Sequence, residues 1–211
     1  KDWGVSWLPL FHDMGLIGFL LTPMYSGGSV TLLPTEEFIF RPSAWLKAIT
    51  EYKATITGAP PSAYALCAKR IKDAEAAQYD LSSIRVALVG AEAVTRESLD
   101  QFGKKFSAAG FRATAFMPTY GLAENCLAVT MPPLDHEPQF DQNNFRKMAD
   151  GIAEDSSGGE TRFFANVGRA LPNTEVAIVD PSGCRLAERR IGEIVIKSPC
   201  LMKGYFNDLR N

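Results

Sequence analysis

The fold is decided by one stretch, Pro118-Thr119-Tyr120-Gly121-Leu122-Ala123-Glu124. It follows a short apolar run, residues 113–117, that is typical of a buried strand, and it leads into residues 125–130, which we expect to form a helix. Turns from a strand into a helix are where open α/β sheets bind their ligands. We therefore expect this turn to face a ligand.

Three residues of the turn are suited to binding. Gly121 lets the backbone approach a ligand closely, Tyr120 offers a flat face for stacking, and Glu124 offers a carboxylate to a phosphate-bound metal. Each also has a structural interpretation: a turn glycine, a packed aromatic ring, and an acid stabilised by a helix N-terminus. The stretch alone leaves both interpretations open.

Strands and helices alternate along the chain before this turn. We expect strands at residues 5–8, 29–33, 54–57, 84–89 and 113–117, with helices at 14–25, 43–52, 62–76 and 95–110. Crossovers of this length join parallel strands through right-handed connections. The sequence therefore predicts an α/β fold with a doubly wound, mostly parallel sheet.

The loops that follow parallel strands lie along one edge of a sheet, where ligands bind. On this chain we expect that edge to carry His12 and Asp13, Glu36 and Glu37, Gly58, residues 90–92 and residues 120–124. The prediction is a single site in which Glu92, Tyr120 and Glu124 enclose one hollow.

The composition changes after Met131. Residues 132–162 are rich in Pro, Asp, Asn, Gly and Ser, and we interpret them as a polar, partly mobile insertion with a short helix at 144–149. Strand-like segments follow at 163–167, 174–179, 192–197 and 201–206. We expect three parts: a parallel α/β subdomain at 1–131 that carries the site, the insertion at 132–162, and a smaller antiparallel β half-barrel at 163–211.

Composition excludes several classes of protein. The chain has 211 residues, 46% of them hydrophobic and 22% charged, with a net charge of −2, which suits one sizeable core. Its Lys and Arg residues are scattered, so we expect no nucleic-acid partner. No apolar stretch approaches the roughly 20 residues of a membrane span, so we expect no stable membrane insertion.

Four cysteines, Cys67, Cys126, Cys184 and Cys200, lie far apart without a Cys-x-x-Cys pair. This spacing argues against a zinc knuckle and against a disulfide scaffold, and it favours a cytoplasmic location. The chain opens without Met, almost directly on a strand, so we expect it to be a fragment of a longer protein.

Four stretches together resemble the adenylate-forming superfamily of acyl-CoA synthetases, fatty acyl-AMP ligases and nonribosomal adenylation domains. They are Trp7-Leu8-Pro9-Leu10-Phe11-His12-Asp13-Met14-Gly15-Leu16, Gly90-Ala91-Glu92-Ala93-Val94, the stretch at 118–124, and Gly192-Glu193-Ile194-Val195-Ile196 with Lys203-Gly204-Tyr205. Their order and spacing resemble the central part of such an enzyme over nearly the whole chain. The sequence at 12–16 and the polar stretch at 135–160 look most like those of the fatty acyl-AMP ligases, whose insertion is thought to restrain a mobile C-terminal domain.

The resemblance implies roles for the matching residues. Gly90, Ala91 and Glu92 would line the adenine of ATP or AMP, Tyr120 would stack on it, and Thr119 with the backbone of Gly121, Leu122 and Ala123 would contact phosphate. His12, Asp13 and Glu124 would be the catalytic groups, with Glu124 also holding Mg²⁺. The acyl channel would be bordered by Met14, Gly15, Gly18, Thr57 and Gly58. Helix packing is the alternative explanation of these glycines, and His12 has a structural alternative as well.

The implied activity is ATP-dependent activation of a fatty acid as acyl-AMP, with release of pyrophosphate and transfer to the thiol of an acyl carrier protein. An acyl-CoA synthetase and a non-catalytic nucleotide- or acyl-binding module remain alternatives. Attack on the α-phosphate needs cations and fixed dipoles, whereas the attacking carboxylate is already ionised and needs no base. The family's phosphate loop, ribose-binding Asp and C-terminal lysine are absent from the sequence, so we expect this chain alone to bind nucleotide weakly without turnover.

Overall fold

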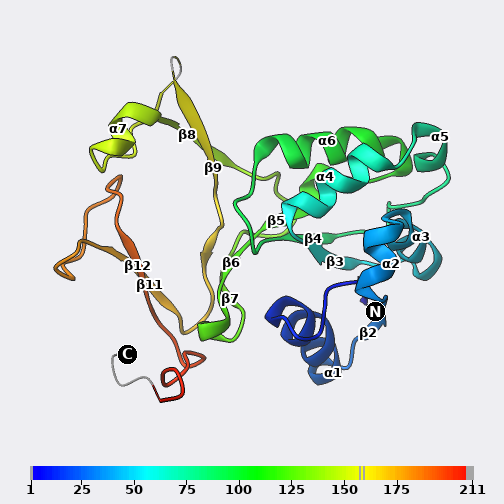
Figure 1. Cartoon of the computed structure of the whole chain (residues 1–211), viewed down its shortest axis with the longest axis horizontal. Helices are drawn as coiled ribbons and strands as arrows, with labels where there is room; N and C mark the ends of the chain where they lie inside the picture. Colours follow the sequence, from blue (N-terminus) through cyan, green and yellow to red (C-terminus); the bar gives the residue numbers. More distant parts are fainter. Residues whose placement is uncertain (1, 157, 159, 208–211) are drawn as a thin grey trace.

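A computed structural model describes residues 2–156, 158 and 160–207 (Figure 1). Its largest sheet has five parallel strands in the order β2-β1-β3-β4-β5. These are β1 (Trp3–Ser6), β2 (Ser29–Leu32), β3 (Ile56–Ala59), β4 (Val86–Val89) and β5 (Phe116–Pro118). This order is that of a doubly wound sheet, with its reversal beside β1. The predicted fold class is confirmed.

Helices cover both faces of the sheet (Figure 1). One face carries α2 (Thr35–Phe40), α3 (Ser43–Tyr52), α4 (Pro61–Arg70), α5 (Asp73–Ala76) and α6 (Arg96–Phe106), and the other carries a π-helix, η1 (Met14–Leu21), followed by α1 (Thr22–Ser26). Neighbouring residues of β3 show the two faces. The Thr57 hydroxyl accepts a hydrogen bond from Trp45 Nε1 at 2.9 Å, whereas a Cβ on Gly58 would lie 3.0 Å from the ring of Phe19.

The predicted helix at 95–110 shows how sequence sets local structure. Thr95 caps α6 by accepting from the Ser98 amide, and Leu99, Phe102 and Phe106 are buried along one face of the helix. A 3-10 turn, η2 (Ser107–Ala109), then ends at Gly110, whose φ of 84° is the left-handed conformation that favours glycine. Sequence and structure agree here on both ends of the helical segment.

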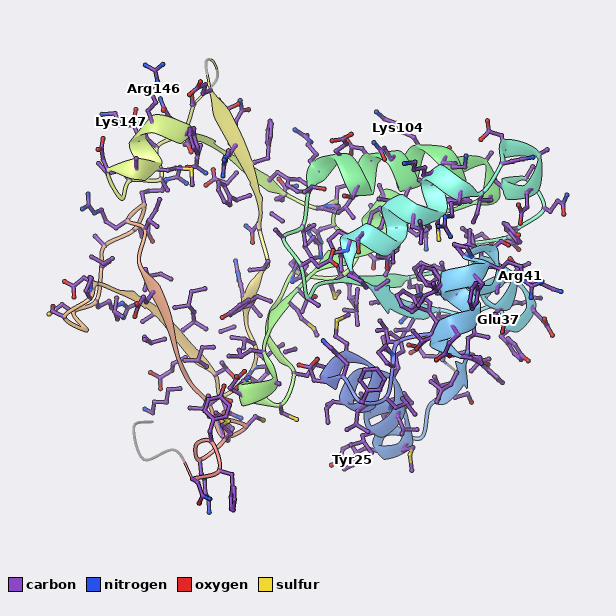
Figure 2. The ribbon with its side chains drawn as sticks, viewed as in Figure 1. Tyr25, Glu37, Arg41, Lys104, Arg146 and Lys147 are labelled. Atoms are coloured by element: carbon purple, nitrogen blue, oxygen red, sulfur yellow. The ribbon has the colours of Figure 1, made fainter. Side chains whose placement is uncertain are left out.

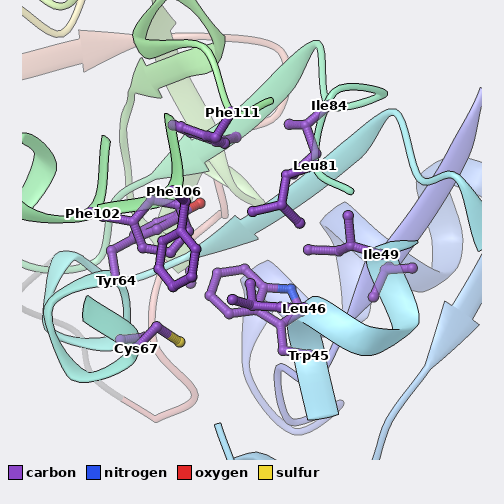
Figure 3. Packing of buried hydrophobic residues seen from close by; sticks show 14 of the residues in the cluster. Trp45, Leu46, Ile49, Tyr64, Cys67, Leu81, Ile84, Phe102, Phe106 and Phe111 are labelled. Carbon is purple, nitrogen blue, oxygen red and sulfur yellow. The ribbon is translucent and has the colours of Figure 1, made fainter. Parts of the chain in front are cut away.

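Aromatic side chains fill the core between the sheet and the helices α3, α4 and α6 (Figure 3). Tyr64 and Phe102 are fully buried and meet edge to face, with ring centroids 5.1 Å apart. Burial of one such side chain contributes about 1.5–3 kcal/mol. Cys67 lies in this core, and burial raises the pKa of its thiol to about 12. The core therefore holds α4 and α6, and the loops that precede them, in fixed positions.

The helix predicted for residues 125–130 is wrong. After β6 (Tyr120–Gly121) the chain makes a 3-10 turn, η4 (Ala123–Asn125), and returns as β7 (Ala128–Met131), antiparallel to β6. Val129 and Thr130 are buried in this strand, and β-branched residues favour strands. Residues 113–115 are also a 3-10 turn, η3 (Ala113–Ala115), so the predicted strand at 113–117 begins only at Phe116. The central stretch is therefore a strand-to-hairpin turn.

The remainder of the chain forms small antiparallel ladders. The strands β8 (Phe140–Asn144) and β9 (Thr161–Ala165) pair with each other, and α7 (Phe145–Ala149) lies in the connection between them. The strand β10 (Arg169–Ala170) pairs with β7. The strand β11 (Glu175–Val179) pairs with β12 (Glu193–Lys197). The strand predicted at 201–206 is wrong, because residues 201–205 have no regular secondary structure and Phe206 lies in a turn. Residues 157, 159 and 208–211, which belong to the predicted insertion and β subdomain, lie outside the described residues. The three domain limits stay a prediction.

None of the described helices combines the length and hydrophobicity that crossing a bilayer requires.

Candidate functional site

A cavity of about 400 Å³ lies at the carboxyl ends of β4 and β5, which is a usual volume for a small-molecule site. Ten predicted site residues line it: His12, Asp13, Met14, Gly18, Gly90, Ala91, Thr119, Gly121, Leu122 and Ala123. The rest of the lining is apolar: Phe11, Phe19, Leu88, Val89, Leu127, Ala128 and Met131. The cavity thus joins an apolar interior to polar loops at the sheet edge.

His12 and Asp13 form a pair at the start of η1. Asp13 caps the helix, since its Oδ1 accepts from the Met14 amide at 2.7 Å, and His12 Nδ1 lies 2.6 Å from the same oxygen. The Met14 amide also donates to His12 Nδ1 at 3.2 Å, so the imidazole is held at its Nδ1 edge. The His12 side chain is 51% exposed and that of Asp13 16%. The pair therefore presents an oriented imidazole at the cavity.

The predicted acyl-binding residues divide into two groups. Met14 and Gly18 line the cavity, and a Cβ on Gly18 would lie 3.3 Å from Leu127 Cδ2. Gly15, Thr57 and Gly58 are not among its lining residues. Their surroundings are closely packed: a Cβ on Gly15 would lie 2.2 Å from the carbonyl oxygen of Pro9, and the Thr57 hydroxyl donates to Val5 O at 2.8 Å in the core.

The loop after β4, residues 90–95, is held in an unusual conformation. Ala91 has a φ of 65°, which is rare for a residue other than glycine and is typical of functional loops. The Glu92 carboxylate accepts from the Ser62 hydroxyl at 2.9 Å and from the Ser62 amide at 3.3 Å, in the first turn of α4. A helix N-terminus stabilises a carboxylate in this position. Glu92 therefore ties the loop to α4.

A second, more open hollow of about 860 Å³ lies beside the cavity and shares Ala91, Thr119 and Gly121 with it. Glu92 and Tyr120 line this hollow, and β9 forms its far wall. Glu124 lines neither space. The structure therefore brings Glu92 and Tyr120 together as predicted but does not bring Glu124 into the same hollow.

Glu124 instead meets the last described segment. The Tyr205 hydroxyl donates to Glu124 Oε1, and the Met202 amide donates to the backbone carbonyl of Glu124 at 2.7 Å. The hydrogen bond from Tyr205 lowers the pKa of the Glu124 carboxyl and raises that of the phenol. Glu124 is therefore ionised at neutral pH. Among the described residues, no three His, Cys, Asp or Glu side chains gather to hold a metal by themselves.

The placement of Glu36 and Glu37 in a loop at this edge is wrong. Both belong to α2, where Glu37 forms an ion pair with Arg41 at 2.9 Å (Figure 2). Sequence reasoning also missed the helix itself, although two acids in its first turn are a signal for a helix start.

Several lining residues were not predicted. Leu88, Leu127 and Met131 line the cavity, and their only signal is an apolar side chain next to a strand end. The wall formed by β9 was missed as well, because residues 161–165 were assigned in part to a polar insertion. The aromatic pair Phe163-Phe164 was the signal for a strand that faces a hollow.

Comparison with known proteins is consistent with this geometry. The family described as AMP-binding enzyme matches residues 1–206. A putative acyl-CoA synthetase of Caulobacter vibrioides is 39% identical over 98% of this chain and 36% of its own length. The medium-chain-fatty-acid–[acyl-carrier-protein] ligase TtuA of Teredinibacter turnerae is 37% identical over 96% of this chain and 32% of its own length.

A solved structure gives the same result in three dimensions. The fatty acyl-adenylate ligase from L. pneumophila, solved with acyl adenylate and pyrophosphate, superposes with a TM-score of 0.95 at 36% identity, over 99% of this chain and 37% of that one. This chain therefore spans about a third of the length of the proteins that it matches. By its sequence over nearly its whole length, the chain belongs to the family of AMP-binding enzymes.

Proposed function

We propose that the protein containing this chain is an ATP-dependent ligase that activates a fatty acid as acyl-AMP, releases pyrophosphate, and passes the acyl group to the thiol of an acyl carrier protein. The observation that carries the proposal is the cavity, whose apolar interior reaches polar loops at the ends of β4 and β5. An alkyl chain suits the apolar part, and a carboxylate with its phosphate suits the polar edge. Family membership supports the same reaction class.

The residues at the polar edge would orient the reactants. Thr119 lines both spaces, so it would lie between an acyl chain in the cavity and a nucleotide in the neighbouring hollow. Tyr120 offers an aromatic face for the adenine, and Ala91 lines both spaces at their junction. Such positioning converts the attack on the α-phosphate into an oriented step, which is a large part of catalysis in phosphoryl-type transfers.

His12 would act near the reacting carboxylate as a hydrogen-bonding group. The substrate carboxylate is ionised at neutral pH and needs no general base. Because Asp13 holds the imidazole by Nδ1, the ring keeps one orientation at the mouth of the cavity. We assign the pair to orientation of the substrate and the adenylate.

Magnesium fits the chemistry of the donor set. Glu124 is half-buried at the tip of the hairpin and carries a carboxylate with a lowered pKa. Mg²⁺ commonly takes one or two protein carboxylates together with substrate phosphates. When bound, Mg²⁺ would neutralise charge on the phosphate oxygens. The Glu124 carboxylate would have to give up its hydrogen bond with Tyr205, or share it, to hold the ion.

The proposed function has two versions, which differ in the molecule that accepts the acyl group. TtuA is named as a ligase of medium-chain fatty acid to acyl carrier protein, whereas the Caulobacter relative is named as a putative acyl-CoA synthetase. We propose the carrier protein as acceptor, with CoA as the alternative, and a cytoplasmic location.

The test is pyrophosphate release by the full-length protein with ATP, Mg²⁺ and saturated acids of increasing length. We expect release that depends on chain length, with acyl-AMP accumulating until an acyl carrier protein with its pantetheine arm is added. Formation of acyl-CoA at a similar rate would select the alternative acceptor. No pyrophosphate release with any acid would contradict the proposed function.

A further inference from the structure

The first residue of α6 contacts both strands of the β8–β9 hairpin. The Arg96 guanidinium carbon lies 5.8 Å from the ring centroid of Phe140 in β8 and 5.4 Å from that of Phe163 in β9. Both distances are within the range of cation–π attraction. Arg96 is the first residue of α6. The hairpin includes β8 and the first two residues of β9 from the predicted insertion at 132–162, and the rest of β9 lies beyond it.

Arg96 also follows directly on the loop at 90–95. That loop is tied to α4 at its other side by the bond between Glu92 and Ser62. It is thus fixed at two points, one inside the α/β layer and one on the hairpin. A shift of the hairpin would reach the loop through Arg96, since one residue separates Arg96 from Val94.

The hairpin contributes directly to the hollow beside the cavity. Residues 161–165 of β9 line one side, and residues 91–97 with Tyr120 line the other. Phe163 is 42% exposed and Phe164 is 43% exposed, so aromatic surface faces open space here. Exposed aromatic surface opposite Tyr120 suits a flat, apolar-faced group such as a purine.

We propose that the β8–β9 hairpin is the second wall of the nucleotide site and that Arg96 is the positioning residue that holds this wall in place. The inference rests on the proposed function, because it takes the hollow beside Tyr120 as the place of the nucleotide. It assigns the insertion a part in ATP binding and not only in the arrangement of neighbouring domains. Arg96 is also one of the residues that line the hollow, and we assign its main effect to its contacts with Phe140 and Phe163.

The experiment measures the dissociation constant of ATP by calorimetry on the full-length protein, which needs no turnover. Arg96→Ala should weaken ATP binding about tenfold, the size expected for the loss of two cation–π contacts of an exposed Arg side chain. Phe163→Ala should weaken ATP binding by a similar factor. Phe163→Tyr should bind ATP as tightly as the wild type, because an aromatic face is kept. KM for the fatty acid should stay unchanged in all three variants. If Arg96→Ala does not fold, Arg96→Lys, which keeps the charge, takes its place in the experiment.

Phe145→Ala is the matched control. It removes a cation–π contact of the same kind, with Arg162 at 4.3 Å, but at the α7 end of the hairpin and away from α6. ATP binding unchanged by Phe145→Ala and weakened by Arg96→Ala supports the proposal. Equal weakening by both variants, or no change with Arg96→Ala, would overturn it.

The proposal and the proposed function fail in different ways. A wild-type protein that binds ATP but releases no pyrophosphate with any acid would contradict the function alone, and the ATP dissociation constants of the variants would still decide the inference. A wild-type protein that binds no ATP would overturn both.

Discussion

The carboxylate of Glu92 accepts a hydrogen bond of 2.9 Å from the hydroxyl of Ser62, and this bond joins the loop after β4 to the first turn of α4. The family resemblance assigned Glu92 to the adenine, whereas the structure gives its carboxylate a partner in the protein. A positioning role predicts that Ser62→Ala and Glu92→Gln weaken ATP binding by similar factors. The double variant should then show a coupling free energy of about 0.5 kcal/mol or more. Calorimetry with ATP on the two single variants and the double variant measures this.

Ser98→Ala is a suitable control, because Ser98 lies in the first turn of α6 and its hydrogen bonds are with Thr95. If Glu92→Gln weakens ATP binding while Ser62→Ala does not, Glu92 touches the nucleotide directly and the positioning role is wrong.

Gly18 sets the width of the cavity in this structure. A Cβ there would already lie 3.3 Å from Leu127 Cδ2, so Gly18→Leu should fill the space available to an alkyl chain. We expect kcat/KM for long acids to fall by about tenfold or more, with a smaller loss for short ones, because each excluded methylene costs about 1–3 kcal/mol. Pyrophosphate release across the acid series measures this. Gly103→Ala in α6, away from the cavity, should leave the chain-length profile unchanged; an unchanged profile with Gly18→Leu would place the acyl chain elsewhere.

The sequence predicted the α/β layer well because local signals agreed with the packing there. Thr95, the apolar spacing of α6 and Gly110 all marked one helix, and the structure confirms it. The prediction at 125–130 was wrong because it assumed the strand-to-helix turn that is typical of α/β sheets, whereas Val129 and Thr130 are buried in a strand that pairs with β6. Strand pairing of β7 with β6 overrode the expected pattern.

The candidate site was predicted in part for the same reason. His12, Gly90 and Thr119 follow strands whose carboxyl ends meet at one edge, and topology alone brings them to one cavity. The contacts Glu92–Ser62, Glu124–Tyr205 and Arg96–Phe163 join segments remote in sequence, and no spacing rule could reveal them.

Arg189 links the hairpin to the loop between β11 and β12. Its guanidinium contacts Asp141 at 2.7 Å, Asn143 at 3.0 Å and Asp155. Because the group is about half exposed, we expect Arg189→Ala to lower the free energy of unfolding by only about 1 kcal/mol. Thermal unfolding measures this, with Arg185→Ala in the same loop as a control that should have little effect.

The same cluster predicts a pH dependence. A hydrogen bond from the Asn143 amide, with further help from Arg189, lowers the pKa of Asp141 in the folded protein. Its stabilising contribution is therefore present above about pH 3.9, the ordinary aspartate pKa, and is lost as the pH falls through the lower folded value. Arg189→Ala should make the loss of stability in acid shallower. If the free energy of unfolding falls equally steeply with decreasing pH in both proteins, this role of Arg189 is wrong.

Cys67 should be the least reactive of the four thiols. It is fully buried, and with its pKa raised to about 12 only about one thiol in ten thousand is ionised at pH 8. Cys126, Cys184 and Cys200 are exposed in the described part of the chain. Brief iodoacetamide treatment followed by peptide mass spectrometry should label Cys126 and spare Cys67 until the protein is unfolded. Rapid native labelling of Cys67 would show that the core opens readily.

The most direct test of the account is a crystal structure of the full-length protein with a non-hydrolysable acyl-adenylate. We predict the alkyl chain between Gly18, Leu88 and Leu127, the phosphate beside Thr119, and the adenine between Tyr120 and the β9 wall. An acyl-adenylate bound away from this cavity, or an adenine that touches neither Tyr120 nor β9, would contradict it.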